Sequence, residues 1–377
     1  LAASCPWSPA SGSYLTQVES HLSTTIGPAA AGLLQTGRSR LDQAAATERL
    51  YQRDLLLRLS DALLPLVDRL LAMAEQNAAR IMPGYTHLQH AQPWTFGHYL
   101  MRQASILLRD LERLDEAYRR TNLSALGGAA GAGTSWPVDR KRVAVLLGHD
   151  GIVVNASDAG GFARDLVEEN TAVLSLLMAN LGRFATDLYV WSTLEFGFVE
   201  IADALAGTSS IMPQKKNPNA LEHVKAIAGQ AIGWLPAILG NQRGVLSTDV
   251  DYSFGDDLFG GFAERSYGAV RLMDAVMETL VVKPTRMEEM AGKGWSTTSH
   301  LVDELARVHS LPHRAAHQIV ARFVRAMIDQ GVAPQEASAA PLRVAARELA
   351  QLDLAITDQE LRHILEPAHF IATRASE

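Results

Sequence analysis

The stretch from residue 47 to residue 80 carries apolar side chains at steps of three and four residues. These side chains are Leu50, Leu55, Leu59, Leu63, Leu66, Leu70 and Met73. An α-helix has 3.6 residues per turn, so this spacing gathers them on one face of a long helix. A helix of this kind is stable in water only if its apolar face is covered along its length. The stretch therefore predicts a bundle of long helices.

Four further stretches carry long helical patterns: 96–120, 165–191, 220–239 and 257–282. Their apolar faces are wider than one partner needs, which predicts that the remaining faces meet other subunits. The composition agrees, because 47% hydrophobic but only 6% aromatic residues favour helices over sheets. A helical-repeat solenoid would show a period of about 30–45 residues, and the sequence has none. We expect an all-α fold, with a long central bundle and small helical domains at either end.

The 377 residues suffice for two or three domains. We expect residues 37–283 to form the central bundle and residues 284–377 a small C-terminal helical domain, because Lys283-Pro284 is typical of a junction. Residues 1–36 begin without Met and read as coil or as the remnant of a larger N-terminal domain.

The charge and cysteine content restrict the partners. A net charge of −7 and a pI near 6.0 argue against nucleic acid or an anionic membrane. The single cysteine, Cys5, excludes an intramolecular disulfide framework and fits a reducing compartment. No apolar run approaches the roughly 20 residues of a membrane span, and no secretory signal pattern is visible. These features predict a cytoplasmic protein.

Residues 207–219 read Gly-Thr-Ser-Ser-Ile-Met-Pro-Gln-Lys-Lys-Asn-Pro-Asn and separate two helical patterns. The Gly and Ser residues favour a turn, and the second half is typical of a helix start, with Asn217 as N-cap and Pro218 in the first helical position. Backbone N–H groups at such a start, beside Lys215 and Lys216, could hold a carboxylate. The alternative is a surface loop whose two lysines face solvent.

Two other polar stretches, 36–43 and 82–92, also lie between long helices, where loops gather at the end of a bundle. The first is doubly basic, and the second begins where Met82-Pro83-Gly84 ends the preceding helix, so we expect a polar loop there. The glycine-rich segment 127–134 lacks the strand-before, helix-after context of a phosphate site. We therefore expect neither a cofactor nor a metal.

All three polar stretches resemble motifs of one family. The loop 207–219 resembles the signature loop of the fumarase/aspartase superfamily of lyases, and its Gln-Lys-Lys-Asn-Pro ending resembles the argininosuccinate lyase branch. Residues 82–98 resemble a second motif of that branch closely, and residues 36–43 resemble a third at all but one position. The resemblance runs through nearly the whole chain from about Tyr14, with the family's N-terminal region mostly absent.

The resemblance implies a carbon–nitrogen lyase that releases fumarate from an N-substituted aspartate by β-elimination. A serine base removes a weakly acidic proton next to a carboxylate, and the resulting aci-carboxylate needs preorganised cations and N–H donors. The implied catalytic residues are Ser209, His87, Glu222 and Lys215, with His87 and Glu222 as a pair. The implied substrate-binding residues are Arg40, Thr86, Gln89, Ser210 and Asn217.

Some polar residues are left open by this reading. A histidine in a loop beside a helix is usually a surface or structural residue, so His90, His98 and His223 receive no role. Lys216 could bind substrate or face solvent. Arg164-Asp165 resembles a family pair but could equally be an ion pair at a helix start.

The sequence departs from the family pattern where the leaving amine would be recognised. Leu41 replaces an Asn that donates a hydrogen bond to substrate in the family, and Leu cannot donate one. Residues 243–259, with Tyr252 displaced, are about two residues shorter than the family segment, and Gly128 replaces a Ser. The elimination machinery is kept, while the contacts to the rest of the substrate have changed.

The sequence therefore predicts an argininosuccinate lyase-like enzyme of amino-acid metabolism, as in arginine biosynthesis, acting on argininosuccinate or a related N-succinyl amino compound. The family forms homotetramers whose active sites combine loops from three subunits, so the expected partners are a small dicarboxylate or amino-acid substrate and further copies of the chain. One alternative is the reverse addition of an amine to fumarate. The other is a non-catalytic family member with a structural or binding role.

Overall fold

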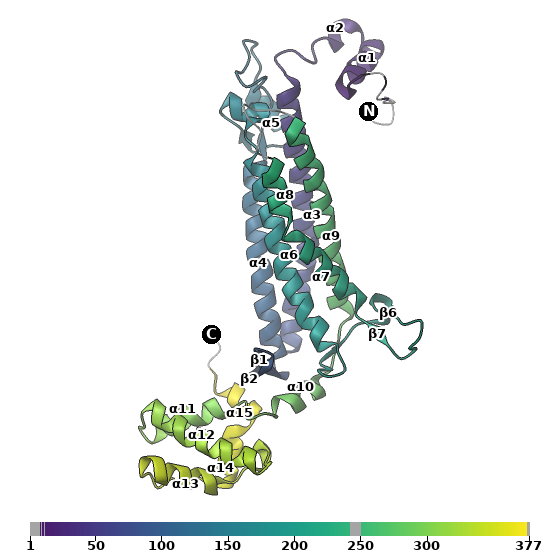
Figure 1. The fold of residues 1–377 in the computed structure, drawn as a ribbon. Coiled ribbons are helices and arrows are strands. Elements are labelled where there is room, and N and C mark those ends of the chain that lie inside the picture. The colour runs from purple at the N-terminus through teal and green to yellow at the C-terminus, as the bar shows by residue number, and fades with distance from the viewer. Residues whose placement is uncertain (1–7, 9, 11, 242–249, 375–377) are drawn as a thin grey trace. The chain divides into compact units, whose positions relative to one another are not determined.

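The computed structural model describes residues 8, 10, 12–241 and 250–374 (Figure 1). It is 67% helical with little strand, which confirms the all-α prediction. The longest helices are α3 (Arg40–Gln76), α4 (Phe96–Thr121), α6 (Asp165–Trp191) and α9 (Val250–Thr279). None of the helices in the described ranges is both long enough and apolar enough to cross a membrane.

Each long helix contributes to two compact units of the chain. Unit 1 comprises residues 1–62, 110–179 and 227–268, and unit 2 comprises residues 63–109, 180–226 and 269–377. The structure confirms the predicted apolar face of α3 in both units, because the leucines at positions 55, 59, 63, 66 and 70 are all buried.

Unit 1 contains the start of α3, and ion pairs join neighbouring helices within it. Arg58 on α3 pairs with Glu264 on α9 at 2.8 Å, and Arg120 on α4 pairs with Glu169 on α6 at 2.6 Å. The shorter elements of this unit are α1 (Tyr14–Ile26), α2 (Pro28–Ala31), β3 (Leu123–Ser124), α5 (Arg140–Leu146), β4 (Gly151–Ile152), a π-helical turn (Asp158–Phe162) and α8 (Trp234–Asn241). Strands β3 and β4 are parallel.

Unit 2 contains three small antiparallel ladders. Strands β1 (Ile81–Thr86) and β2 (Gln89–Thr95) form a hairpin, β5 (Val199–Glu200) pairs with β8 (Val281–Val282), and β6 (Gly207–Thr208) pairs with β7 (Lys216–Asn217). Helix α7 (Asn219–Ala231) starts in this unit. The helices after β8 are α10 (Pro284–Ala291), α11 (Thr298–Val308), α12 (His313–Asp329), α13 (Ala339–Ala350), α14 (Asp358–Leu365) and α15 (Pro367–Ala372).

The helices after β8 bury a core of their own, which includes Trp295, Phe323 and Leu342. A capping box fixes the start of α14, because Thr357 accepts from the Glu360 N–H while the Glu360 carboxylate accepts from the Thr357 N–H.

Three details of the sequence-based prediction were wrong. Residues 82–92 lie in the β1–β2 hairpin and not in a loop. The helix predicted over 220–239 is interrupted between α7 and α8, where Gly233 follows Ile232. Asn217 is not the N-cap of α7, because it lies in β7 opposite Gly207, and the Pro218 carbonyl accepts the first helical hydrogen bond, from the Glu222 N–H at 3.1 Å.

Candidate active site

His87 occupies the tip of the β1–β2 hairpin. The facing pair Thr86 and Gln89 is joined by only two residues, His87 and Leu88, whose φ angles are 54° and 57°. Two consecutive left-handed residues make a type I′ turn, whose twist matches that of the flanking strands. The predicted residues Thr86, His87 and Gln89 are all exposed at this tip, where they can reach a ligand.

Contacts below the tip hold the hairpin. The Tyr85 hydroxyl lies 3.3 Å from His90 Nε2, and the two rings meet edge to face at 5.2 Å. Tyr85 also packs on Phe196 and Phe198, with ring centroids 5.5 and 6.3 Å away. Burial raises the pKa of Tyr85 to about 12, so the hydroxyl stays protonated. His90, which received no role from the sequence, therefore helps to support the hairpin that presents His87.

Ser209 lies just beyond the neck that β6 and β7 form at the base of the signature loop. Its Oγ accepts hydrogen bonds from the Ile211 N–H at 3.3 Å and from the Met212 N–H at 3.0 Å. Two N–H donors aimed at one oxygen favour negative charge on it, because hydrogen bonding to the charged form stabilises that form. The next residue, Ser210, is exposed.

The two adjacent lysines of this loop have different surroundings. Lys216 Nζ pairs with Glu200 at 3.1 Å and with Asp203 at 2.6 Å, and these hydrogen bonds raise the pKa of Lys216, that with Asp203 most. Lys215 is exposed and makes no ion pair with another described residue. Of the two, Lys215 is the cation that can meet a ligand without first giving up a partner.

Glu222 lies in the first turn of α7 and is exposed. The Tyr189 hydroxyl on α6 donates to its Oε1 at 3.1 Å, and this hydrogen bond raises the pKa of Tyr189. The structure describes one chain, and among its described contacts Glu222 and His87 do not meet.

In unit 1, Asp42 organises the 36–43 motif. Its buried carboxylate accepts from three backbone N–H groups: Ser39 at 2.9 Å, Gly127 at 3.0 Å and Ala129 at 2.9 Å. The motif beside Arg40 is thereby tied to the glycine-rich segment. In the sequence analysis Asp42 received no role, although an acidic side chain within this motif could have indicated one.

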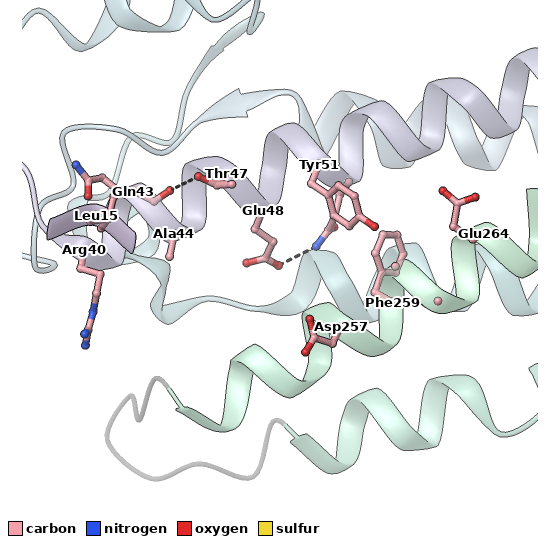
Figure 2. A pocket seen from close by; sticks show the side chains of 13 residues that line it. Leu15, Arg40, Gln43, Ala44, Thr47, Glu48, Tyr51, Asp257, Phe259 and Glu264 are labelled. Atoms are coloured by element: carbon pink, nitrogen blue, oxygen red, sulfur yellow. Dashed lines mark hydrogen bonds between the residues drawn. The ribbon is translucent and has the colours of Figure 1, made fainter. Parts of the chain in front are cut away.

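Arg40 and Gln43 line a cavity of about 610 Å³ between the start of α3 and the start of α9 (Figure 2). The other lining side chains include three carboxylates, Glu48, Asp257 and Glu264. Two of these already have cations, because Glu48 pairs with Arg164 and Glu264 pairs with Arg58 outside the lining.

Arg164, which the sequence left open, forms an ion pair with Glu48.

The structure describes only part of the two stretches that would recognise the leaving amine. Leu41 is partly exposed at the start of α3. Residues 243–249 lie outside the described residues, and residues 250–256, Tyr252 included, are described only as helical backbone of α9.

The predicted site residues thus fall into separate groups. Thr86, His87 and Gln89 share the hairpin tip, Ser209, Ser210, Lys215 and Asn217 share the signature loop with Glu222 just after it, and Arg40 lies in unit 1. In the described ranges, no group of three or more His, Cys, Asp or Glu side chains is arranged to hold a metal ion.

Two protein-family models match the chain. The model described as "Lyase" matches residues 5–233, and the model described as "Argininosuccinate lyase C-terminal" matches residues 295–372. The first covers more than half of the chain.

Individual relatives agree with these models. An argininosuccinate lyase of Methanothrix thermoacetophila is 39% identical over 95% of this chain and 72% of its own length. A crystal structure of EDDS lyase in complex with formate superposes with a TM-score of 0.87 at 34% identity, over 96% of this chain and 72% of that one. A variant of EDDS lyase with bound fumarate gives a TM-score of 0.86 at the same identity and coverage. The chain belongs to the argininosuccinate lyase family of the fumarase/aspartase superfamily and is a carbon–nitrogen lyase.

Proposed function

We propose that this lyase eliminates fumarate from an N-substituted aspartate, with Ser209 as the base. The observation that carries the proposal is the environment of Ser209, whose oxygen accepts two backbone N–H groups in the loop that also presents Lys215. The relatives support it, since one is an argininosuccinate lyase and another, an EDDS lyase variant, holds fumarate.

The reaction begins with transfer of a proton from the carbon next to a substrate carboxylate to Ser209 Oγ. The electron pair moves into that carboxylate and gives an aci-carboxylate, which Lys215 and Asn217 stabilise. The carbon–nitrogen bond then breaks, the pair returns to form the fumarate double bond, and the amine leaves with a proton from His87. Glu222 supports the imidazolium of His87, while Thr86, Gln89 and Ser210 bind the succinyl group.

The site is completed in a homotetramer, where the hairpin of one subunit meets the signature loop of another. An exposed apolar stripe on α3 supports this assembly: Leu57, Leu64 and Leu71 follow one another at seven-residue steps and are 44, 47 and 36% exposed. We expect a monomeric preparation to be inactive, and an active monomer in light scattering would refute the shared site.

The substrate is argininosuccinate or a related N-succinyl amino compound. Arg40, which lines the cavity of unit 1, binds a carboxylate of this substrate. The same site could run the reverse addition of an amine to fumarate, since both directions pass through the same intermediate and transition states. A panel of N-substituted aspartates, assayed in both directions, identifies the amine.

The decisive test is ultraviolet detection of fumarate with the Ser209→Ala variant. Loss of a positioned base predicts a fall in kcat of about 10²–10⁴-fold. Ser105→Ala, which removes a serine hydroxyl bonded to its own helix α4, is the matched control and should match wild type. Failure of the wild type to release fumarate from any substrate, with Ser209→Ala indistinguishable from it, would leave only the non-catalytic alternative. A fully active Ser209→Ala beside an active wild type would show that Ser209 is not the base.

A further inference from the structure

Glu200 joins two lysines that are far apart in the sequence. Its Oε1 lies 3.1 Å from Nζ of Lys216 in the signature loop, and its Oε2 lies 2.6 Å from Nζ of Lys283. Lys283 directly follows β8 and precedes α10. One carboxylate thus connects the signature loop with the start of the C-terminal helices.

Backbone hydrogen bonds set the frame for this connection. Glu200 faces Val281 in the β5–β8 ladder, and the Lys283 N–H donates to the Phe198 carbonyl at 2.8 Å. Lys216 faces Thr208 in the β6–β7 ladder, which forms the neck of the signature loop. The Glu200 side chain therefore ties one ladder to the other. Asp203, the second partner of Lys216, lies closer, at 2.6 Å, but its side chain is 95% exposed to competing water, and among the described contacts it does not join Lys216 to Lys283 as Glu200 does.

The connection separates the two lysines of the loop. Lys215 lies just before β7, where its N–H donates to the Met212 carbonyl at 3.1 Å. Its side chain is exposed and makes no ion pair with another described residue, so holding Lys216 on Glu200 leaves Lys215 as the lysine that is available to a ligand.

We propose that Glu200 is a positioning residue of the lyase site: it fixes the neck of the signature loop through Lys216 and Lys283, so that Lys215 and not Lys216 meets the substrate carboxylate. This inference rests on the proposed function of Ser209 and Lys215. Hydrogen bonds lower the pKa of Glu200, and the bond with Lys283 contributes most. The carboxylate is therefore ionised near neutral pH. The pairs are solvent-exposed, with the side chains of Glu200 and Lys216 45 and 32% accessible, so salt weakens them.

Glu200→Gln tests the inference because the amide keeps the shape and loses both ion pairs. Misplacement of the loop predicts a fall in kcat of about tenfold to a hundredfold, with secondary structure unchanged. The matched control is Glu289→Gln in the same unit, since Glu289 also bridges two exposed cations, Arg286 at 3.0 Å and Lys293 at 2.6 Å. The control should retain wild-type kcat.

Two further readouts separate positioning from general structure. Hydrogen exchange of the backbone amides in residues 205–219 should be faster in Glu200→Gln than in wild type or Glu289→Gln. If Glu200 acts through Lys216, the double variant with Lys216→Met should be no less active than the worse single variant, because coupled residues are not additive.

The outcomes also distinguish this inference from the proposed function. An inactive wild type, or an active Ser209→Ala, overturns the proposed function itself. Suppose instead that the wild type is active and Ser209→Ala is inactive. If Glu200→Gln then equals Glu289→Gln in kcat and in hydrogen exchange, only the role of Glu200 is overturned. Additive losses in the double variant also overturn it.

Discussion

The Tyr189 hydroxyl donates a hydrogen bond to the Glu222 carboxylate at 3.1 Å, and Lys225 Nζ lies 3.8 Å from the centre of the Tyr189 ring. The tyrosine thus holds the side chain that we propose as partner of His87.

Tyr189→Phe isolates this hydroxyl, because phenylalanine keeps a ring for Lys225. Loss of one partly exposed hydrogen bond to a carboxylate predicts a fall in kcat of about threefold to tenfold, with a nearly unchanged KM. Steady-state kinetics check this against Tyr118→Phe, whose hydroxyl accepts from Asn122 elsewhere in the fold. Equal kinetics for both variants would contradict an orienting role for Tyr189.

Leu41→Asn should raise the turnover of argininosuccinate if Leu41 is what excludes this substrate. A single restored hydrogen bond predicts a gain in kcat/KM of about threefold to tenfold. The fumarate assay measures the gain, with Leu146→Asn at an exposed position of α5 as control. An unchanged rate would move attention to residues 243–259.

Asp42→Asn should destabilise unit 1, because an amide nitrogen cannot accept from the N–H groups that the carboxylate serves. The expected loss in the free energy of unfolding is about 2–3 kcal/mol. Chemical denaturation followed by circular dichroism measures it. Asp61→Asn, at an exposed position of α3, should stay within about 0.5 kcal/mol of wild type; a loss of similar size there would show that the three N–H groups are not the cause.

Gly207→Ala should disturb the neck of the signature loop, because an added Cβ would lie 2.1 Å from Asn219 Nδ2. The displaced loop predicts a fall in kcat of about tenfold or more. At Gly229 on α7 an added Cβ meets nothing within 4 Å, so Gly229→Ala should keep activity and gain about 0.5–1 kcal/mol of stability. Wild-type kcat in Gly207→Ala would mean that the neck tolerates the shift.

The C-terminal helices should lose stability in mild acid because of His300. The residue is 4% exposed, and burial lowers its pKa below the ordinary 6.5, with Glu304 opposing this less strongly. Below pH 6.5 the unfolded chain therefore binds more protons at this position than the folded one, so stability falls as the pH falls through that range. Thermal unfolding between about pH 7.5 and pH 5 should show a smaller drop for His300→Gln than for wild type. His313→Gln, at an exposed position, should show the same drop in Tm as the wild type. If His300→Gln also shows the full drop in Tm, the acid sensitivity belongs to another group.

The long helices were predictable because their signal is local. Leu55, Leu59 and Leu63 lie at helical steps in the sequence, and the structure buries all three. The hairpin was not predictable in this way, because Met82-Pro83-Gly84 is typical of a break. Its strands depend on contacts with distant residues such as Phe196.

The site residues divide in the same way, into those that a local motif predicts and those whose surroundings depend on distant contacts. The family motif pointed to Ser209, His87 and Lys215, but it left Lys216 open between substrate and solvent. The structure pairs Lys216 with Glu200 and Asp203, which the fold brings to it. The N-cap at Asn217 was wrong for a related reason, because pairing with Gly207 draws Asn217 into a strand.

The two-residue turn at His87 and Leu88 has a thermodynamic consequence for the role that we propose for His87. A long loop loses conformational entropy each time a substrate orders it, at a cost of about 1–2 kcal/mol per residue fixed. A type I′ turn between the paired residues Thr86 and Gln89 has almost no such freedom left. The ordering of the His87 backbone is therefore completed once, during folding, and is not repeated with each substrate molecule.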